Sequence, residues 1–389
     1  MAPHVRSDRG REAGFTLLEI LITLGITLII MAGTMKAMTD AVRSNELAQA
    51  TTQMNQGLRT AMDVMVRDML QVGQGLPSGR TIDIPNGTGA TPVLLPGPPA
   101  QPGYPTPAQR TLPAGATEMT AILPGTGLGP TINGVATDVI TFILADGAFL
   151  STISDYDVNL TALGPSSMTV DPTVDISNGG ADDLHAGDLI MLMKGTSTTL
   201  VQITSLPTGS NNQTANFGAT DSLNLNQTTA AFGTLAAHLN TAPADTCTGS
   251  GCFVPTTATR IRMITYYIDA TTDPARPRLV RRVNNGNPTI YNNSLGTALA
   301  FDVENLQVSY DLVDGVSNPA EVKFTAADVA GTAGGRCAPN PCSPNQIRKI
   351  NLTLSGRSRV PLRQTGQYLR NSLATQVSLR SMSFIDRYR

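Results

Sequence analysis

An unbroken helical pattern occupies the early part of the chain. Its longest apolar run ends at Met35, and no proline occurs between Phe15 and Leu76. Past this run, apolar residues recur every three or four positions, as on one face of a helix: Leu58, Met62, Met65, Met69 and Val72. The charged residues of this part are expected elsewhere on its surface: Arg43, Glu46, Arg59, Asp63, Arg67 and Asp68. Because Gly73, Gly75 and Pro77 follow, the pattern predicts one helix over residues 15–75.

This helix is predicted to have two parts. The helical period from Phe15 to Val72, about 58 residues at ~1.5 Å rise, would give a rod of roughly 87 Å. The part from Phe15 to Met35 is apolar enough to span a membrane, and there is no second run of about 18 apolar residues, so a single pass is expected. The later stripe is expected to pack on a globular domain, although its methionines could instead form an adaptable partner surface.

Strand patterns fill the remainder, residues 76–389. Runs rich in β-branched and aromatic residues predict strands over 138–144, 189–193, 199–203, 261–268, 279–283, 303–312, 347–354 and 374–379. Residues 77–130, rich in proline and glycine, and residues 207–255 are expected to be long loop insertions with few regular elements. The pattern therefore predicts an α+β fold, with a long amino-terminal helix packed on an antiparallel β-sheet domain.

The strand predicted over residues 261–268 carries apolar residues on both faces. One face would present Ile261, Met263, Thr265 and Tyr267, and the other Arg262, Ile264, Tyr266 and Ile268. This suits a sheet covered by the helix on one side and by loops or a neighbour on the other.

Composition sets limits on the function. Charged residues make up 14% of the chain and the formal net charge is −2, so no strongly basic nucleic-acid surface is indicated. The carboxy-terminal tail is locally basic but has few aromatic residues for base stacking, so solvated charges or subunit contacts are expected there and nucleic-acid binding is not. Its arginines are Arg357, Arg359, Arg363, Arg370, Arg380, Arg387 and Arg389.

The junction before the apolar run is the most informative part of the chain. It reads Gly14-Phe-Thr-Leu-Leu-Glu19, after a leader with three arginines and two acids. Positive charge before the run predicts a cytoplasmic amino terminus. A secretory signal would place its cleavage site after the apolar core. Here the candidate site lies before the core, so the apolar segment would be retained.

This junction resembles the processing site of type IV pilins and of the pseudopilins of type II secretion. The resemblance implies that a prepilin peptidase cuts after Gly14, removing residues 1–14, and that Phe15 becomes the methylated amino terminus. Glu19 would then be the fifth mature residue, able to pair with the terminal amine of a neighbouring subunit, and such a pair is strong in low dielectric. The alternative is an ordinary membrane anchor with an incidental glutamate.

The four cysteines form two local pairs, Cys247 with Cys252 and Cys337 with Cys342. The residues between each pair are turn-forming, so each pair can close a small loop. Because the domain would be exported, two disulfides are expected. A zinc site built from all four cysteines is the rival interpretation.

A second resemblance lies in the carboxy-terminal third. Two predicted strands form a hairpin pattern, and they contain Tyr266-Tyr-Ile and Leu279-Val-Arg-Arg. A third predicted strand follows, Val303-Glu-Asn-Leu-Gln-Val-Ser-Tyr310. This order is similar to that of PilW-type minor pilins and of the related J-type minor pseudopilins.

Catalytic signatures are sparse. The glycine-rich segment 125–129 is followed by Pro130, not by a phosphate-binding helix, and is interpreted as a loop. The acidic turn around His185, and Asp311 with Asp314, could bind a divalent cation through oxygens, but solvated turns are expected. The chain is therefore expected to be a non-enzymatic structural protein without cofactor or metal.

The resemblance implies a minor pilin that initiates or tips a type IV pilus. Expected partners are other pilins, the prepilin peptidase, the inner-membrane assembly platform and the membrane itself. The chain would sit in the inner membrane with a periplasmic domain until assembly. Alternatives are a minor pseudopilin of type II secretion and a pilus-tip adhesin or ligand-binding module that uses residues 77–130 and 207–255.

Overall fold

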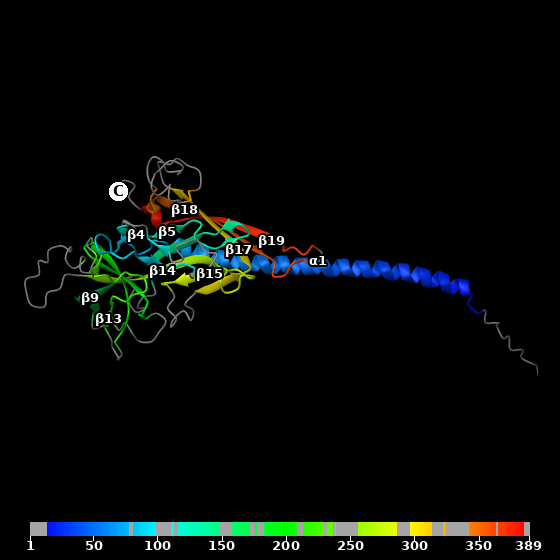
Figure 1. Cartoon of the computed structure of the whole chain (residues 1–389), viewed down its shortest axis with the longest axis horizontal. Helices are drawn as coiled ribbons and strands as arrows, with labels where there is room; N and C mark the ends of the chain where they lie inside the picture. Colours follow the sequence, from blue (N-terminus) through cyan, green and yellow to red (C-terminus); the bar gives the residue numbers. More distant parts are fainter. Residues whose placement is uncertain are drawn as a thin grey trace, which may run out of the picture.

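The fold combines one long helix with a β-rich domain (Figure 1). The computed structural model describes residues 14–77, 81–98, 110–112, 116–147, 157–171, 176, 183–195, 197–207, 213–228, 230, 232–235, 238, 256–285, 296–312, 322–323, 342–362 and 365–384. The helix precedes antiparallel sheets in the chain and projects from the domain as a rod. The predicted α+β class is therefore confirmed.

Helix α1 spans Leu17–Gln71 and is about 82 Å long at ~1.5 Å per residue. Its buried residues begin at Met54 and follow the predicted stripe: Met54, Leu58, Ala61, Met62, Met65 and Met69. Beyond Gln71, Gly73 and Gly75 adopt φ angles of 74° and 70°, which a residue with a Cβ rarely adopts. These glycines end the helix where the sequence predicted.

The largest sheet is organised around β14 (Thr257–Asp269). One half of β14 pairs with β8 (Val139–Ala145) and β15 (Arg278–Val283), and the other half with β9 (Asp157–Leu163) and β11 (Leu189–Lys194). Thirteen residues span about 43 Å at ~3.3 Å each, so one strand joins two groups of strands. The other members are β5 (Ile122–Gly125), β10 (Ser167–Val170), β12 (Ser197–Gln202), β13 (Thr214–Asn216) and β16 (Thr297–Phe301).

A second sheet of three strands lies against the helix. It consists of β17 (Val303–Leu312), β18 (Ile347–Arg357) and β19 (Arg370–Ser378). At Gly356, β18 approaches α1 so closely that an added Cβ would lie 3.1 Å from the Leu58 side chain. Short two-stranded ribbons and single-turn helices complete the domain: β1 (Thr81–Asp83) with β4 (Glu118–Thr120), β2 (Leu94–Leu95) with β3 (Arg110–Thr111), β6 (Thr131–Ile132) with β7 (Val135–Ala136), η1 (Pro344–Gln346) and η2 (Ser381–Phe384).

The domain has two main hydrophobic cores. The larger joins the α1 stripe to both sheets, and it contains Val303, Leu306, Val308 and Tyr310, as predicted. The smaller belongs to β9–β13, which we call the distal module, and includes Leu160, Met168, Ile190, Val201 and Phe217. The distal module lies at the end of the molecule farthest from the start of α1 (Figure 1).

The eight predicted strands correspond to β8, β11, β12, β14, β15, β17, β18 and β19. The expectation for β14 is also confirmed, since apolar residues of both its faces are buried. Tyr266 turns its hydroxyl toward α1, whereas Tyr267 packs with Val139 and Val280 in a separate small cluster.

Residues 77–130 are more ordered than the sequence suggested. They contain β1–β5 and bury several apolar side chains in the larger core, including Ile82, Ile84, Val93, Leu95 and Met119. These strands have two to four residues each and are too short to show a period in the sequence. Within residues 207–255, β13 was likewise missed.

Asp68 corrects the prediction that the charged residues of α1 lie on its surface. Its side chain is 14% exposed and accepts a hydrogen bond from Arg281 Nε at 2.7 Å. The Tyr266 hydroxyl donates to the same carboxylate oxygen. Helical periodicity assigns a residue to a face but not to a partner, so the sequence could not reveal this link between helix and sheet.

Candidate functional site

The cleavage site predicted from the sequence, between Gly14 and Phe15, lies just before the helix. Gly14 has no atom near the position of an added Cβ, and Phe15 is 83% exposed. Thr16 has extended backbone angles, with φ −78° and ψ 149°, and caps α1. The Gly14–Phe15 peptide bond is therefore accessible in a non-helical segment, as a peptidase substrate must be.

Glu19 and Thr16 form a capping box at the start of α1. The Glu19 N–H donates to Thr16 Oγ1 at 3.3 Å, while the Thr16 N–H and hydroxyl donate to Glu19 Oε2 at 3.0 and 3.1 Å. These bonds satisfy groups that a helix start leaves unpaired. Sequence reasoning missed Thr16, although its spacing of three residues from Glu19 is the signature of such a box.

The capping box fixes the carboxylate close to the new amino terminus. Cleavage after Gly14 would place an amine on Phe15, next to the residue that Glu19 caps. The pairing of Glu19 with a neighbour's amine stays a prediction, since it involves a second subunit. The carboxylate that the pairing requires is nevertheless held in place before any neighbour arrives.

The apolar half of α1 contacts none of the described residues of the domain. This helix is long and apolar enough to cross a membrane, and none of its most apolar stretch is buried. Its threonine hydroxyls are satisfied internally, because Thr23 donates to Glu19 O and Thr27 to Thr23 O. Exposed apolar residues continue past Met35, with Met38 at 71% and Val42 at 48%. The exposed face therefore extends toward the domain.

The acidic turn around His185 is part of a buried ion network. Arg260, itself 4% exposed, lies 2.6 Å from Asp146 and 3.9 Å from Asp188, and donates to the Asp183 carbonyl at 2.7 Å. Burial raises the pKa of Asp188, while the charge of Arg260 opposes this. Since an arginine occupies the place between the carboxylates, the turn is a structural link between β8, β11 and β14.

Other candidate cation ligands are bound to protein groups or lie outside the described residues. Asp311 accepts hydrogen bonds from Asn351 at 2.9 Å and Gln376 at 3.0 Å, and Asp314 is not among the described residues. Within the part of the chain that the structure describes, no three His, Cys, Asp or Glu side chains converge as metal ligands.

The basic tail is partly neutralised within the fold. Glu304 accepts hydrogen bonds from Arg357 at 3.2 Å and from Arg370 at 2.6 Å. These arginines therefore stabilise the sheet as well as carrying surface charge. Arg363, Arg387 and Arg389 lie outside the described residues.

The predicted disulfides fall largely outside the described residues. Cys342 is buried in the larger core, but Cys247, Cys252 and Cys337 are not described. Both pairings therefore stay predictions.

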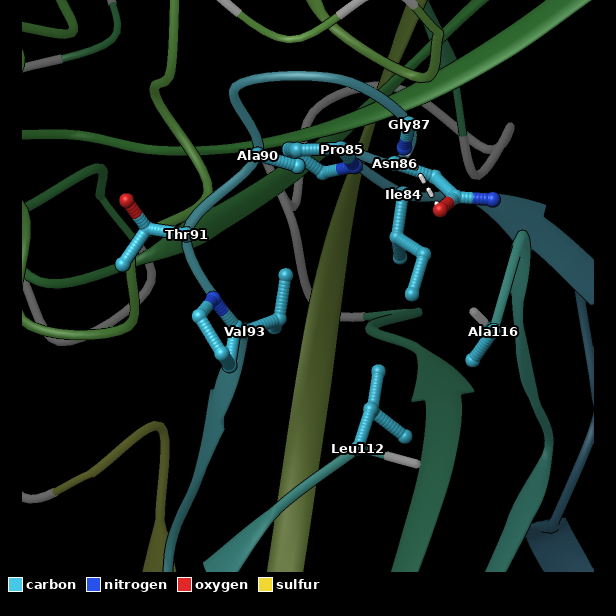
Figure 2. A pocket seen from close by; sticks show the side chains of 10 residues that line it. Ile84, Pro85, Asn86, Gly87, Ala90, Thr91, Val93, Leu112 and Ala116 are labelled. Carbon is cyan, nitrogen blue, oxygen red and sulfur yellow. Dashed lines mark hydrogen bonds between the residues drawn. The ribbon is translucent and has the colours of Figure 1, made fainter. Parts of the chain in front are cut away.

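One small cavity of about 170 Å³ lies between residues 84–93 and residues 112–116. In Figure 2 the side chains of Ile84, Val93, Leu112 and Ala116 point into it, whereas that of Thr91 points away. None of the lining residues that the structure describes is charged. The described residues that line the cavity could make apolar contacts with a small molecule, but they include no catalytic group.

The comparison with known families agrees with the junction. A family model described as the prokaryotic N-terminal methylation motif matches residues 9–35. The match supports a protein of the type IV prepilin-like superfamily. The matched residues cover the junction and the apolar run, where the sequence predicts cleavage and methylation. No curated protein and no solved structure matches the chain.

Proposed function

We propose that the chain is a minor pilin of PilW type that helps to initiate or tip a type IV pilus filament. The observation that carries the proposal is the methylation motif at the start of a 55-residue helix, none of whose most apolar stretch is buried. An exposed apolar helix surface of this size is unfavourable in water, so we expect a membrane to cover it before assembly and neighbouring helices to cover it afterwards. The membrane would be the inner membrane, with the domain in the periplasm.

The distal module favours a place at the filament end. It has its own core and lies beyond the carboxy-terminal end of α1 (Figure 1). In a filament of parallel helices, a module in this position would face the next subunit along the axis. At a tip it has no subunit above it. This supports a minor subunit rather than the bulk subunit of the shaft.

Two substitutions of Glu19 test the assembly role. Glu19→Val removes both the charge and the capping acceptor, whereas Glu19→Gln keeps an acceptor at the third helical position and removes only the charge. If the carboxylate pairs with a neighbour's amine, both variants should insert into the membrane yet be depleted from sheared filaments. Normal incorporation of Glu19→Gln would show that Glu19 acts as a helix cap alone and would refute the pairing.

A pseudopilin of type II secretion would have the same junction and helix. A deletion strain scored together for piliation, twitching and secretion separates the two. Loss of piliation with normal secretion supports the pilus assignment, and the opposite result supports the pseudopilin.

A further inference from the structure

A cluster of arginine and aromatic side chains lies on the rim of the domain nearest to the exposed half of α1. We call it the basal patch: Arg276, Phe301, Arg357, Val360, Tyr368 and Arg370. Its position follows from two contacts with the first buried turns of the helix. Asn371 donates to Asn55 at 2.7 Å, and Gly356 packs against Leu58. Burial of α1 begins at Met54, so the patch lies where the helix leaves the domain.

The segments that form the patch are held together by a continuous set of contacts. The Arg276 guanidinium lies 5.3 Å from the centre of the Phe301 ring, and that of Arg357 lies 4.1 Å from the centre of the Tyr368 ring. Arg357 also donates to the Ala275 carbonyl, which joins the two stacked pairs. The side chains are therefore arranged before any partner binds, and preorganisation of this kind lowers the entropy cost of binding.

The carboxylates within the patch point inward, while the side chains of Arg276 and Arg370 are 36% and 52% exposed. Glu304 and Asp302 are 6% exposed, and they pair with Arg357 and Arg370 and with Arg276, respectively. Arg359 beside the patch is also exposed. The surface thus offers guanidinium donors to a partner.

The patch also exposes apolar side chains. Phe301 is 56% exposed and Val360 is 63% exposed. Arginine and aromatic residues are enriched at the energetic centres of protein interfaces, where they are surrounded by apolar contacts. A protein partner fits this composition better than a solvated rim does.

The partner follows from the position of the patch. A subunit packed along the exposed half of α1 must pass the point where the helix enters its domain, and the basal patch flanks that point. We infer that the basal patch binds the adjacent pilin-type subunit through a surface that presents carboxylates and an aliphatic side chain. This inference rests on the proposed function, because it requires assembly.

Cross-linking of the full-length chain in cells tests the contact. A photo-reactive phenylalanine analogue at position 360 should yield a product with another pilin-type subunit, and the product should be lost when the prepilin peptidase is absent. The matched control is the same analogue at Phe232, which is 65% exposed and is bridged to Asn86 near the cavity, away from the patch. That position should not give the same product.

The outcomes separate the patch from the proposed function. If the chain enters filaments but position 360 gives no subunit product, the inference about the patch is overturned and the minor pilin assignment stands. If the processed chain never enters filaments, both are overturned.

A charge comparison at position 360 gives a second, independent readout. The Val360 side chain is mostly exposed, so replacing it should leave the thermal midpoint unchanged. Val360→Glu sets a negative charge against the inferred carboxylates and should lower filament incorporation by about threefold or more, since like charges across an interface are unfavourable. Val360→Lys, which loses the same apolar contact but adds a positive charge, should be incorporated better than Val360→Glu. Equal incorporation of the two variants would overturn the inferred chemistry of the partner.

Discussion

The link between α1 and the sheet at Asp68 gives the sharpest stability prediction. Asp68→Asn keeps the side chain's shape and an acceptor for Tyr266, but removes the charge that Arg281 contacts at 2.7 and 3.3 Å. Burial disfavours the Arg281 charge, and the hydrogen bond and charge of Asp68 outweigh this, so the pKa of Arg281 is raised. Without the Asp68 carboxylate, the Arg281 guanidinium is still partly buried but has lost the negative charge that stabilises it there.

The magnitude follows from the exposure of the pair. Breaking a fully buried pair costs roughly 3–5 kcal/mol, and a hydrogen bond to a charged group contributes about 1.5–3 kcal/mol. Because the Asp68 and Arg281 side chains are 14% and 24% exposed, the loss of stability should lie closer to the second of these ranges. We expect the free energy of unfolding to fall by about 2–3 kcal/mol, or roughly 30- to 150-fold in the folding equilibrium.

The assay is urea unfolding of the full-length chain in detergent micelles. Tyrosine fluorescence reports on the domain because the chain has no tryptophan and eight tyrosines. The matched control is Asp63→Asn, the same change at an exposed position of the same helix, which should alter the free energy by less than about 0.5 kcal/mol. A double-mutant cycle that combines Asp68→Asn with Arg281→Met measures the coupling energy of this pair. Equal effects of the two asparagine variants, or zero coupling in the cycle, would refute the reasoning.

Three further predictions concern His238, Arg110 and the four cysteines. Burial, followed by the charge of Lys194, lowers the pKa of His238 to about 4 from 6.5, so its contribution is complete above pH 6.5 and is lost as the pH falls toward 4. Between pH 7.5 and pH 5 the wild type should lose about 2 kcal/mol more than His238→Leu in urea unfolding, and parallel pH profiles would contradict this. Arg110 is buried, and its guanidinium donates to Thr141 and to two backbone carbonyls. Lysine cannot make all three bonds, so Arg110→Lys should lower the free energy of unfolding by about 2–3 kcal/mol in the same assay. An unchanged free energy would show that the guanidinium geometry is not needed. Thiol trapping of exported protein should find no free cysteine among the four, and full labelling of the native protein would exclude the disulfides.

Much of the architecture could be predicted because its signals are periodic. The stripe that includes Leu58 and Met65 predicts the buried face of α1, and β-branched runs predict eight of the thirteen strands that the structure describes in the two main sheets. The distal module was not foreseen as a unit. Its strands β10 and β13 are only four and three residues long, and β9 interrupts its apolar residues with aspartate, asparagine and threonine, so these sequences look like loops. Only pairing with the long β14 and its neighbours makes them strands.

The functional residues also fall into those that the sequence predicts and those that it does not. Gly14, Phe15 and Glu19 could be predicted because the junction is a local motif. The role of Thr16 was also encoded locally, and a search for helix caps would have found it. The basal patch could not be predicted, because it brings together Arg276, Phe301 and Arg357, which no sequence period connects.

The proposed function requires that this chain be processed as a prepilin and assembled through its new amino terminus. Mass spectrometry of the chain recovered from the membranes of cells with an active prepilin peptidase tests this processing. We expect a mature chain that begins at methylated Phe15 and lacks residues 1–14. An intact leader, or cleavage after the apolar run, would contradict it.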